Sequence, residues 1–110
     1  MQITDSAHGE VTVLQCEGRL TMTTARPFRE AIEARITGGT TRLVLDLSAT
    51  EFIDSSGLGA LIAGLKRARQ AGGDLRIAGA GTQVLTVLNL TNLDRVLRPH
   101  DSVEEACDGW

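Results

Sequence analysis

Residues 43–65 read LVLDLSATEFIDSSGLGALIAGL, and they are the most informative part of the chain about its fold. The nearly continuous apolar run at 42–47 predicts a short strand that is buried on both faces, as in a parallel sheet. A turn follows, and a helix is expected from about Ser56 to Ala71. Its apolar residues recur at the spacing of one helical face: Leu58, Leu61, Ile62 and Leu65. The stretch therefore predicts the strand and helix of a crossover unit.

Similar elements flank this unit on both sides. We expect strands at 2–5, 11–17 and 75–78. A first helix should run between the threonines at 21, 23 and 24 and Gly38, and a third helix should be capped by Thr82 and ended by a left-handed Asn92. A capping box at 102–105 should open a short last helix. Strands that alternate with helices predict a single α/β domain over residues 1–110. Its sheet should be mixed, with four to five strands, and about four helices should accompany it.

The composition excludes several classes of function. The chain has 110 residues, 42% of them hydrophobic, which is enough for one core without a metal or disulfide staple. A net charge of −3 and only three aromatic residues argue against nucleic-acid binding. The start of the chain lacks the basic and apolar regions of a signal peptide, and no apolar run reaches membrane-spanning length, so a cytoplasmic protein is expected. Cys16 and Cys107 are expected to be free thiols, Cys16 in the core and Cys107 more exposed.

Catalytic, nucleotide and metal motifs are incomplete. A nucleophile elbow needs Gly-x-Ser-x-Gly, but Ile53 and Asp54 stand where the first glycine belongs for the two adjacent serines. Two Gly-x-Gly pairs, at 57–59 and 79–81, lack the third glycine of a dinucleotide loop. The two histidines and two cysteines are scattered without ligand spacing. No enzyme activity, cofactor or metal is therefore expected.

Two adjacent serines open the helix after the central strand. Ser55 and Ser56 follow Asp54 just beyond the carboxyl end of that strand, where open α/β sheets carry their sites. One interpretation is structural: Asp54 or Ser55 caps the helix and Ser56 lies in its first turn. The other is functional, because the free N–H groups and the dipole of a helix N-terminus stabilise a phosphate.

Three glycines within this helix, Gly57, Gly59 and Gly64, each cost about 0.5–1 kcal/mol relative to alanine. Close packing of the helix backbone against its own sheet would compensate for that cost. Contact of a docking protein with a smooth surface of small residues, Ala63 among them, would also compensate for it. The spacing of the residues does not separate these two explanations.

The chain resembles a known family in several motifs: Leu45-Asp-Leu47, Phe52-Ile-Asp-Ser-Ser-Gly-Leu-Gly59, Ala71-Gly-Gly-Asp-Leu75, Leu90-Thr-Asn-Leu-Asp94 and Ser102-Val-Glu-Glu-Ala106. These are similar to the STAS domain of bacterial anti-sigma-factor antagonists, and the resemblance covers nearly the whole chain. It implies a binding module, monomeric or weakly dimeric. Unphosphorylated, it holds an anti-sigma factor and thereby frees a sigma factor.

The resemblance also implies roles for single residues. Ser56 would be phosphorylated by the anti-sigma factor, which is itself a serine kinase, and a phosphatase would reset it. Ser55 would be its neighbour and the helix cap. The docking surface would comprise Asp54, Ser55, Gly57, Gly59, Ala63 and Thr21. Thr21 departs from the pattern, because the family usually has an acidic residue at this position. STAS-like domains also serve as scaffold subunits of signalling assemblies and of lipid or anion transport systems, which is the alternative function.

Overall fold

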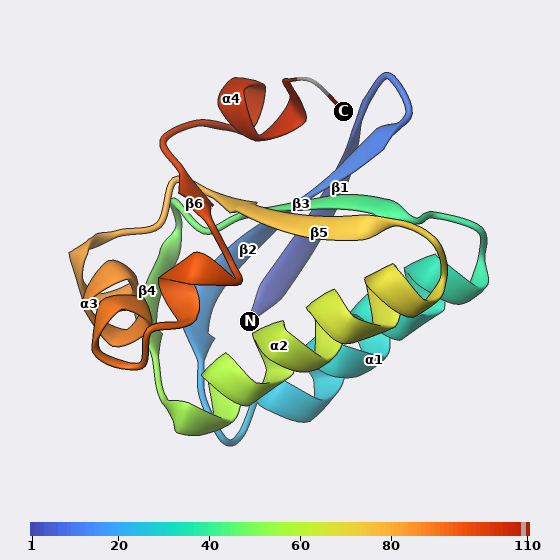
Figure 1. The fold of residues 1–110 in the computed structure, drawn as a ribbon. Helices are drawn as coiled ribbons and strands as arrows, with labels where there is room; N and C mark the ends of the chain where they lie inside the picture. The colour runs from blue at the N-terminus through green and yellow to red at the C-terminus, as the bar shows by residue number, and fades with distance from the viewer. Residues whose placement is uncertain (109) are drawn as a thin grey trace.

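The fold follows from a computed structural model that describes residues 1–108 and Trp110 (Figure 1). The elements in chain order are β1 (Gln2–His8), β2 (Val11–Leu20), α1 (Ala25–Thr37), β3 (Arg42–Asp46), β4 (Thr50–Ile53), α2 (Ser55–Gln70), β5 (Asp74–Ala78), α3 (Thr82–Leu90), the 3₁₀ turn η1 (Leu93–Arg95), β6 (Pro99–His100) and α4 (Val103–Cys107). The α/β class and the mixed sheet are confirmed, and four α-helices lie within the described residues.

The sheet runs in the order β1-β2-β3-β5-β6, and β4 pairs separately with β2. β1 and β2 form an antiparallel hairpin, whereas every other pairing is parallel. β2 is long enough to pair twice, first with β3 and then with β4, and the register of the β4 pairing shifts between Gly18 and Arg19. Within the described residues the sheet thus has six strands instead of the expected four or five, and the two strands not expected from the sequence are the short β4 and β6.

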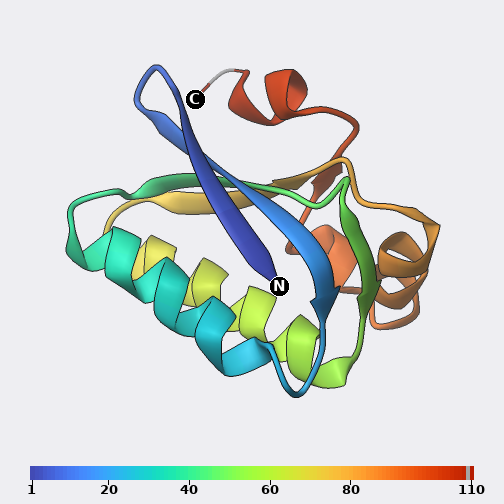
Figure 2. The ribbon, with the colours of Figure 1, turned by 180° about the vertical axis from the view of Figure 1, so that it is seen from behind.

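Helices cover the two faces of the sheet unequally (Figures 1 and 2). α1 and α2 lie side by side beneath one face, and α4 lies on the opposite face. The main core is aliphatic apart from Phe28 and Cys16, and it joins α1 and α2 to the sheet through Ile32, Leu61, Leu65, Leu45 and Ile77. Each such side chain contributes about 1.5–3 kcal/mol on burial. A smaller core under α4 holds Val13, Val44 and Ala106.

Several local expectations are confirmed and one is wrong. Asn92 has φ 59°, in the left-handed region, and Ser102 caps α4 by accepting a hydrogen bond from the Glu105 N–H at 3.2 Å. Thr82 does not cap α3: Gly81 occupies the cap position and no side chain caps this helix. The Thr82 backbone is already helical, so its hydroxyl lies one residue too far along the chain to act as the cap.

Both cysteines are free thiols, Cys16 buried and Cys107 half-buried. Burial raises the pKa of the Cys16 thiol to about 12, so this group stays protonated at neutral pH and is a poor nucleophile. Among the described helices, none is long and apolar enough to cross a membrane.

Candidate functional site

Asp54 opens α2 as its N-cap. Its backbone is extended, and its side-chain Oδ1 accepts a hydrogen bond from the Gly57 N–H at 2.8 Å. Ser55 is the first helical residue, so the expectation that Ser55 is the cap is wrong. Aspartate and serine cap helices about equally well, and only the backbone conformation at 54 and 55 decides between them.

The same carboxylate joins the helix to a distant loop. Its Oδ2 accepts a hydrogen bond from the Met22 N–H at 3.0 Å, and the Asp54 N–H donates to the Leu20 carbonyl oxygen at 3.2 Å. These bonds connect the start of α2 to the segment between β2 and α1. The pKa of Asp54 is lowered, chiefly by the hydrogen bond from Gly57 and further by the one from Met22, because both stabilise the charged form.

The lowered pKa predicts a pH dependence of stability. The folded state binds the Asp54 proton more weakly than the unfolded state, so this stabilisation is present above the ordinary pKa of 3.8 and is lost as the pH falls through the folded value. Urea unfolding of the parent and of Asp54→Asn should therefore show a stability difference that shrinks as the pH is lowered from 7 to about 3. A difference independent of pH would contradict the role given to the carboxylate.

Thr21 lies in the loop that Asp54 holds. Its N–H donates to the Thr24 hydroxyl at 2.9 Å, and that hydroxyl donates to the Arg19 carbonyl oxygen at 2.7 Å. The Thr21 and Thr23 hydroxyls are 3.2 Å apart. This network builds a tight turn, and the next residue is Met22, whose N–H contacts Asp54. The structure therefore brings Thr21 and Asp54 into adjoining segments.

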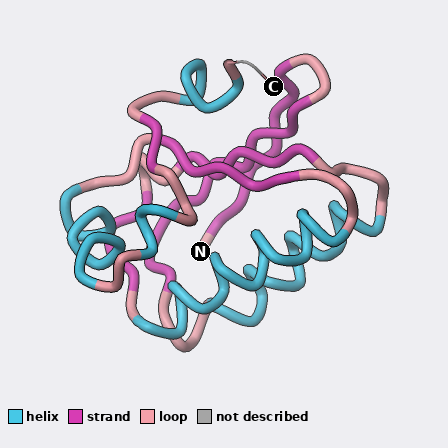
Figure 3. Tube along the Cα trace, in the orientation of Figure 1, coloured by secondary structure: helices cyan, strands magenta, loops and turns pink. Residues whose placement is uncertain are grey.

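Ser56 is the second residue of α2 and is exposed. It lies at one end of a groove between α1 and α2, where a pocket of about 390 Å³ is lined by Met22, Ala25, Arg26, Arg29, Ser56, Gly59, Ala60 and Ala63. The two helices lie alongside each other (Figure 3), and the colour gradient of Figure 1 shows that they run in the same direction. Three of the predicted site residues, Ser56, Gly59 and Ala63, thus share one surface. Met22 beside them is 75% exposed.

The surroundings of the three glycines of α2 differ, and so does the explanation for a glycine at each position. A Cβ on Gly57 would lie 2.1 Å from the Leu20 carbonyl oxygen, so the helix start needs glycine to approach β2. A Cβ on Gly64 would lie 3.0 Å from the Ile32 Cδ1, where α2 packs on α1. Gly59 is exposed, and a Cβ there would meet nothing within 4 Å. Internal packing therefore explains Gly57 and Gly64, whereas Gly59 is a small residue on an open surface.

Gln83 of α3 supports the start of α2, a role that was not predicted from the sequence. Its side-chain nitrogen donates to the Ile53 carbonyl oxygen at 2.9 Å, and its side-chain oxygen accepts from the Ile53 N–H at 2.9 Å. This amide therefore satisfies both backbone groups at the end of β4, immediately before Asp54. No local signal marks Gln83, because its role depends on where α3 packs against β4.

Replacing Gln83 by alanine should lower the free energy of unfolding by about 1–3 kcal/mol, because the partly buried Ile53 groups lose their partners. The matched control is Thr86→Ala in the same helix, where an exposed hydroxyl bonds only to the Thr82 carbonyl one turn away. Chemical unfolding of both variants tests this. Equal stability of the two variants would contradict the support assigned to Gln83.

The chain is similar to proteins of one known family in both sequence and structure. A family model described as "Mlab, STAS domain" matches residues 3–99. The chain is 31% identical to the anti-sigma-F factor antagonist RsfB of Mycobacterium tuberculosis over 97% of this chain and 87% of that protein. The crystal structure of an anti-sigma factor antagonist from Mycobacterium paratuberculosis matches with a TM-score of 0.85 and 28% identity, over 96% of this chain and 89% of that one.

The structure of the Bacillus cell fate determinant SpoIIAA in its phosphorylated form shares the fold, with a TM-score of 0.73 and 20% identity over 97% of each chain. Fold, motifs and relatives agree, and the chain belongs to the STAS-domain family of anti-sigma factor antagonists.

Proposed function

We propose that this domain binds an anti-sigma factor with serine-kinase activity through the start of α2, and that phosphorylation of Ser56 ends the binding. The single observation that carries the proposal is the position of Ser56, exposed at a helix N-terminus and on one groove with Gly59 and Ala63. In the unphosphorylated state the domain occupies the anti-sigma factor, and a sigma factor is released in the cytoplasm.

Phosphoryl transfer would use ATP held by the partner. The Ser56 Oγ forms a bond to the γ-phosphorus, the bond between that phosphorus and ADP breaks, and the hydroxyl proton leaves to a base of the kinase. A phosphatase would reset the site by hydrolysis. The proposal assigns no catalytic turnover to this chain, which serves as the substrate and the binding partner.

The phosphate should act on binding with little effect on the fold. It adds about −1.5 to −2 charges at pH 7. An anion near a helix N-terminus is favourable by about 0.3–1 kcal/mol, and the Asp54 carboxylate offsets part of that gain. At an interface the same charge must lose its water or meet like charges, which costs several kcal/mol. Thr21 offers the partner a hydroxyl instead of the carboxylate usual in the family, so partner choice should differ from that of a typical member.

Capture of partners from a native lysate, followed by ATP and mapping of phosphate by mass spectrometry, tests the proposal. We expect an anti-sigma factor among the captured proteins and one phosphate, on Ser56. Ser56→Ala should remain unmodified, whereas the matched Ser55→Ala should still be modified. Phosphate on Ser55 would contradict the assignment, and capture of a transport ATPase in place of an anti-sigma factor would support the scaffold alternative.

A further inference from the structure

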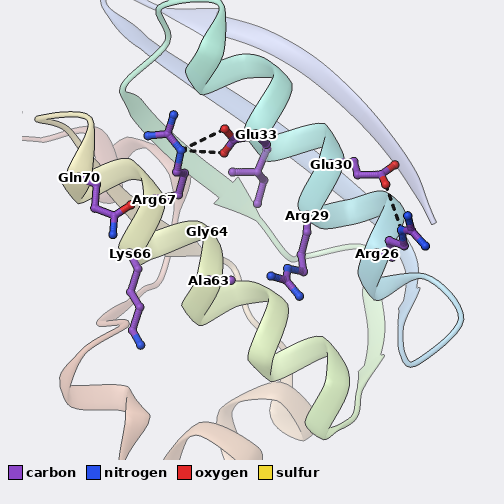
Figure 4. Close-up of a pocket in the computed structure, with 10 residues that line it drawn as sticks. Arg26, Arg29, Glu30, Glu33, Ala63, Gly64, Lys66, Arg67 and Gln70 are labelled. Carbon is purple, nitrogen blue, oxygen red and sulfur yellow. Dashed lines mark hydrogen bonds and ion pairs between the residues drawn. The ribbon is translucent and has the colours of Figure 1, made fainter.

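The groove between α1 and α2 is the basic part of an acidic chain. Beyond the pocket at Ser56 the groove continues into a larger pocket of about 680 Å³ (Figure 4). The charged residues that line this larger pocket are Arg26, Arg29, Lys66, Arg67, Glu30 and Glu33. Four basic and two acidic side chains leave a local excess of two positive charges, although the formal net charge of the chain is −3. The rest of the molecule is correspondingly more acidic.

The four cations differ in what they contact. Arg26 pairs with Glu30 at 3.2 Å, and Arg67 pairs with Glu33 at 2.9 Å. Within the part of the chain that the structure describes, Arg29 and Lys66 make no ion pair. Figure 4 shows the Arg29 side chain extending from α1 across the groove toward α2, near Ala63. Arg29 lines both the larger pocket and the pocket that contains Ser56, whereas Lys66 lines the larger pocket alone.

We propose that Arg29 is the intramolecular counter-ion of the phosphate on Ser56. The proposal rests on the proposed function, because it needs Ser56 as the phosphate acceptor. A guanidinium group donates two parallel hydrogen bonds to phosphate oxygens, which a lysine cannot do. Arg29 can pair without giving up an existing ion pair, whereas Arg26 would have to leave Glu30.

Few other charges face Ser56. The Asp54 carboxylate caps the same helix, and Arg26 and Glu30 lie on α1 beside Arg29. The loop at 21–24 and the helix α3 carry no charged side chain. Pairing would draw Arg29 toward the start of α2 and cancel part of the positive charge of the groove. The partner would therefore meet a changed groove as well as a new phosphate.

The test uses the full chain with phosphoserine installed at position 56 during translation, so it needs no kinase or partner. The second pKa of a serine phosphate is about 6, and a neighbouring guanidinium lowers it. Titration followed by ³¹P NMR should show that Arg29→Gln raises this pKa by about 0.5–1. The matched Lys66→Gln removes the same charge farther along the groove and should change it by less than about 0.2. Arg29→Lys keeps the positive charge but cannot donate two parallel hydrogen bonds. Its phosphate pKa should therefore lie between those of the parent and Arg29→Gln.

Equal phosphate pKa values in the parent, Arg29→Gln and Lys66→Gln would overturn the proposal, as would a larger effect of Arg26→Gln than of Arg29→Gln. Arg29 is exposed, so its variants should keep the fold, which circular dichroism checks. These outcomes are independent of whether a kinase modifies Ser56. A failure of the Arg29 pairing is therefore distinguishable from a failure of the proposed function.

Discussion

Replacing Gly57 by alanine is expected to lower the free energy of unfolding by about 3 kcal/mol, because the new Cβ would lie 2.1 Å from the Leu20 carbonyl oxygen and 2.9 Å from the Ile53 Cγ1. The nearest obstacle is backbone, so no side-chain rotation relieves it. The start of α2 would have to move away from β2 and lose the hydrogen bonds around Asp54. For a domain of this size we expect the Tm to fall by roughly 10–20 °C in a thermal unfolding experiment.

Gly59→Ala is the matched control, two residues farther along the same helix. A Cβ there meets nothing within 4 Å, so the substitution should raise stability by about 0.5–1 kcal/mol through helix propensity and a more restricted unfolded chain. The two substitutions thus have opposite predicted signs. If both were neutral, or if Gly59→Ala were the more damaging, the packing of α2 described above would be wrong.

Ser56→Asp is expected to weaken binding to the anti-sigma factor by about 30-fold or more while the domain stays folded. One negative charge at the contact surface costs about 2 kcal/mol or more through lost hydration and like-charge contact, and 1.4 kcal/mol corresponds to a factor of ten. The same charge near the N-terminus of α2 does not disfavour the helix. Isothermal titration of the captured partner measures the loss, and circular dichroism checks the fold.

Two variants make this result specific to position 56. Ser56→Ala should bind as the parent does, because it adds no charge and removes only an exposed hydroxyl. Ser55→Asp introduces the same charge one residue earlier and should weaken binding less. Binding of Ser56→Asp at parental affinity would count against a charge-operated switch at this residue.

The main elements could be predicted from the sequence because their signals are local. The apolar run at 42–47 and the helical spacing after Ser56 predicted β3 and α2 to within about two residues at each end. The left-handed Asn92 and the Ser102 cap were also predicted, since each depends on a few neighbouring residues. The family resemblance, confirmed by the comparisons, directed attention to Ser56.

The features that were missed depend on contacts between distant segments. β4 has only four residues and exists because the far half of β2 lies beside it, and the two-residue β6 depends in the same way on β5. Gln83 lies 30 positions from Ile53 and meets it only in the folded chain. Arg29 reads as an ordinary exposed helical residue until α2 is placed next to α1.

A comparison of Kd values shows whether a phosphate on Ser56 switches partner binding. The unmodified chain and the chain carrying phosphoserine at position 56 would each be titrated against the anti-sigma factor captured from lysate. We expect the phosphorylated chain to bind at least about 100-fold more weakly, with its fold retained. Equal Kd values for the two forms would contradict it.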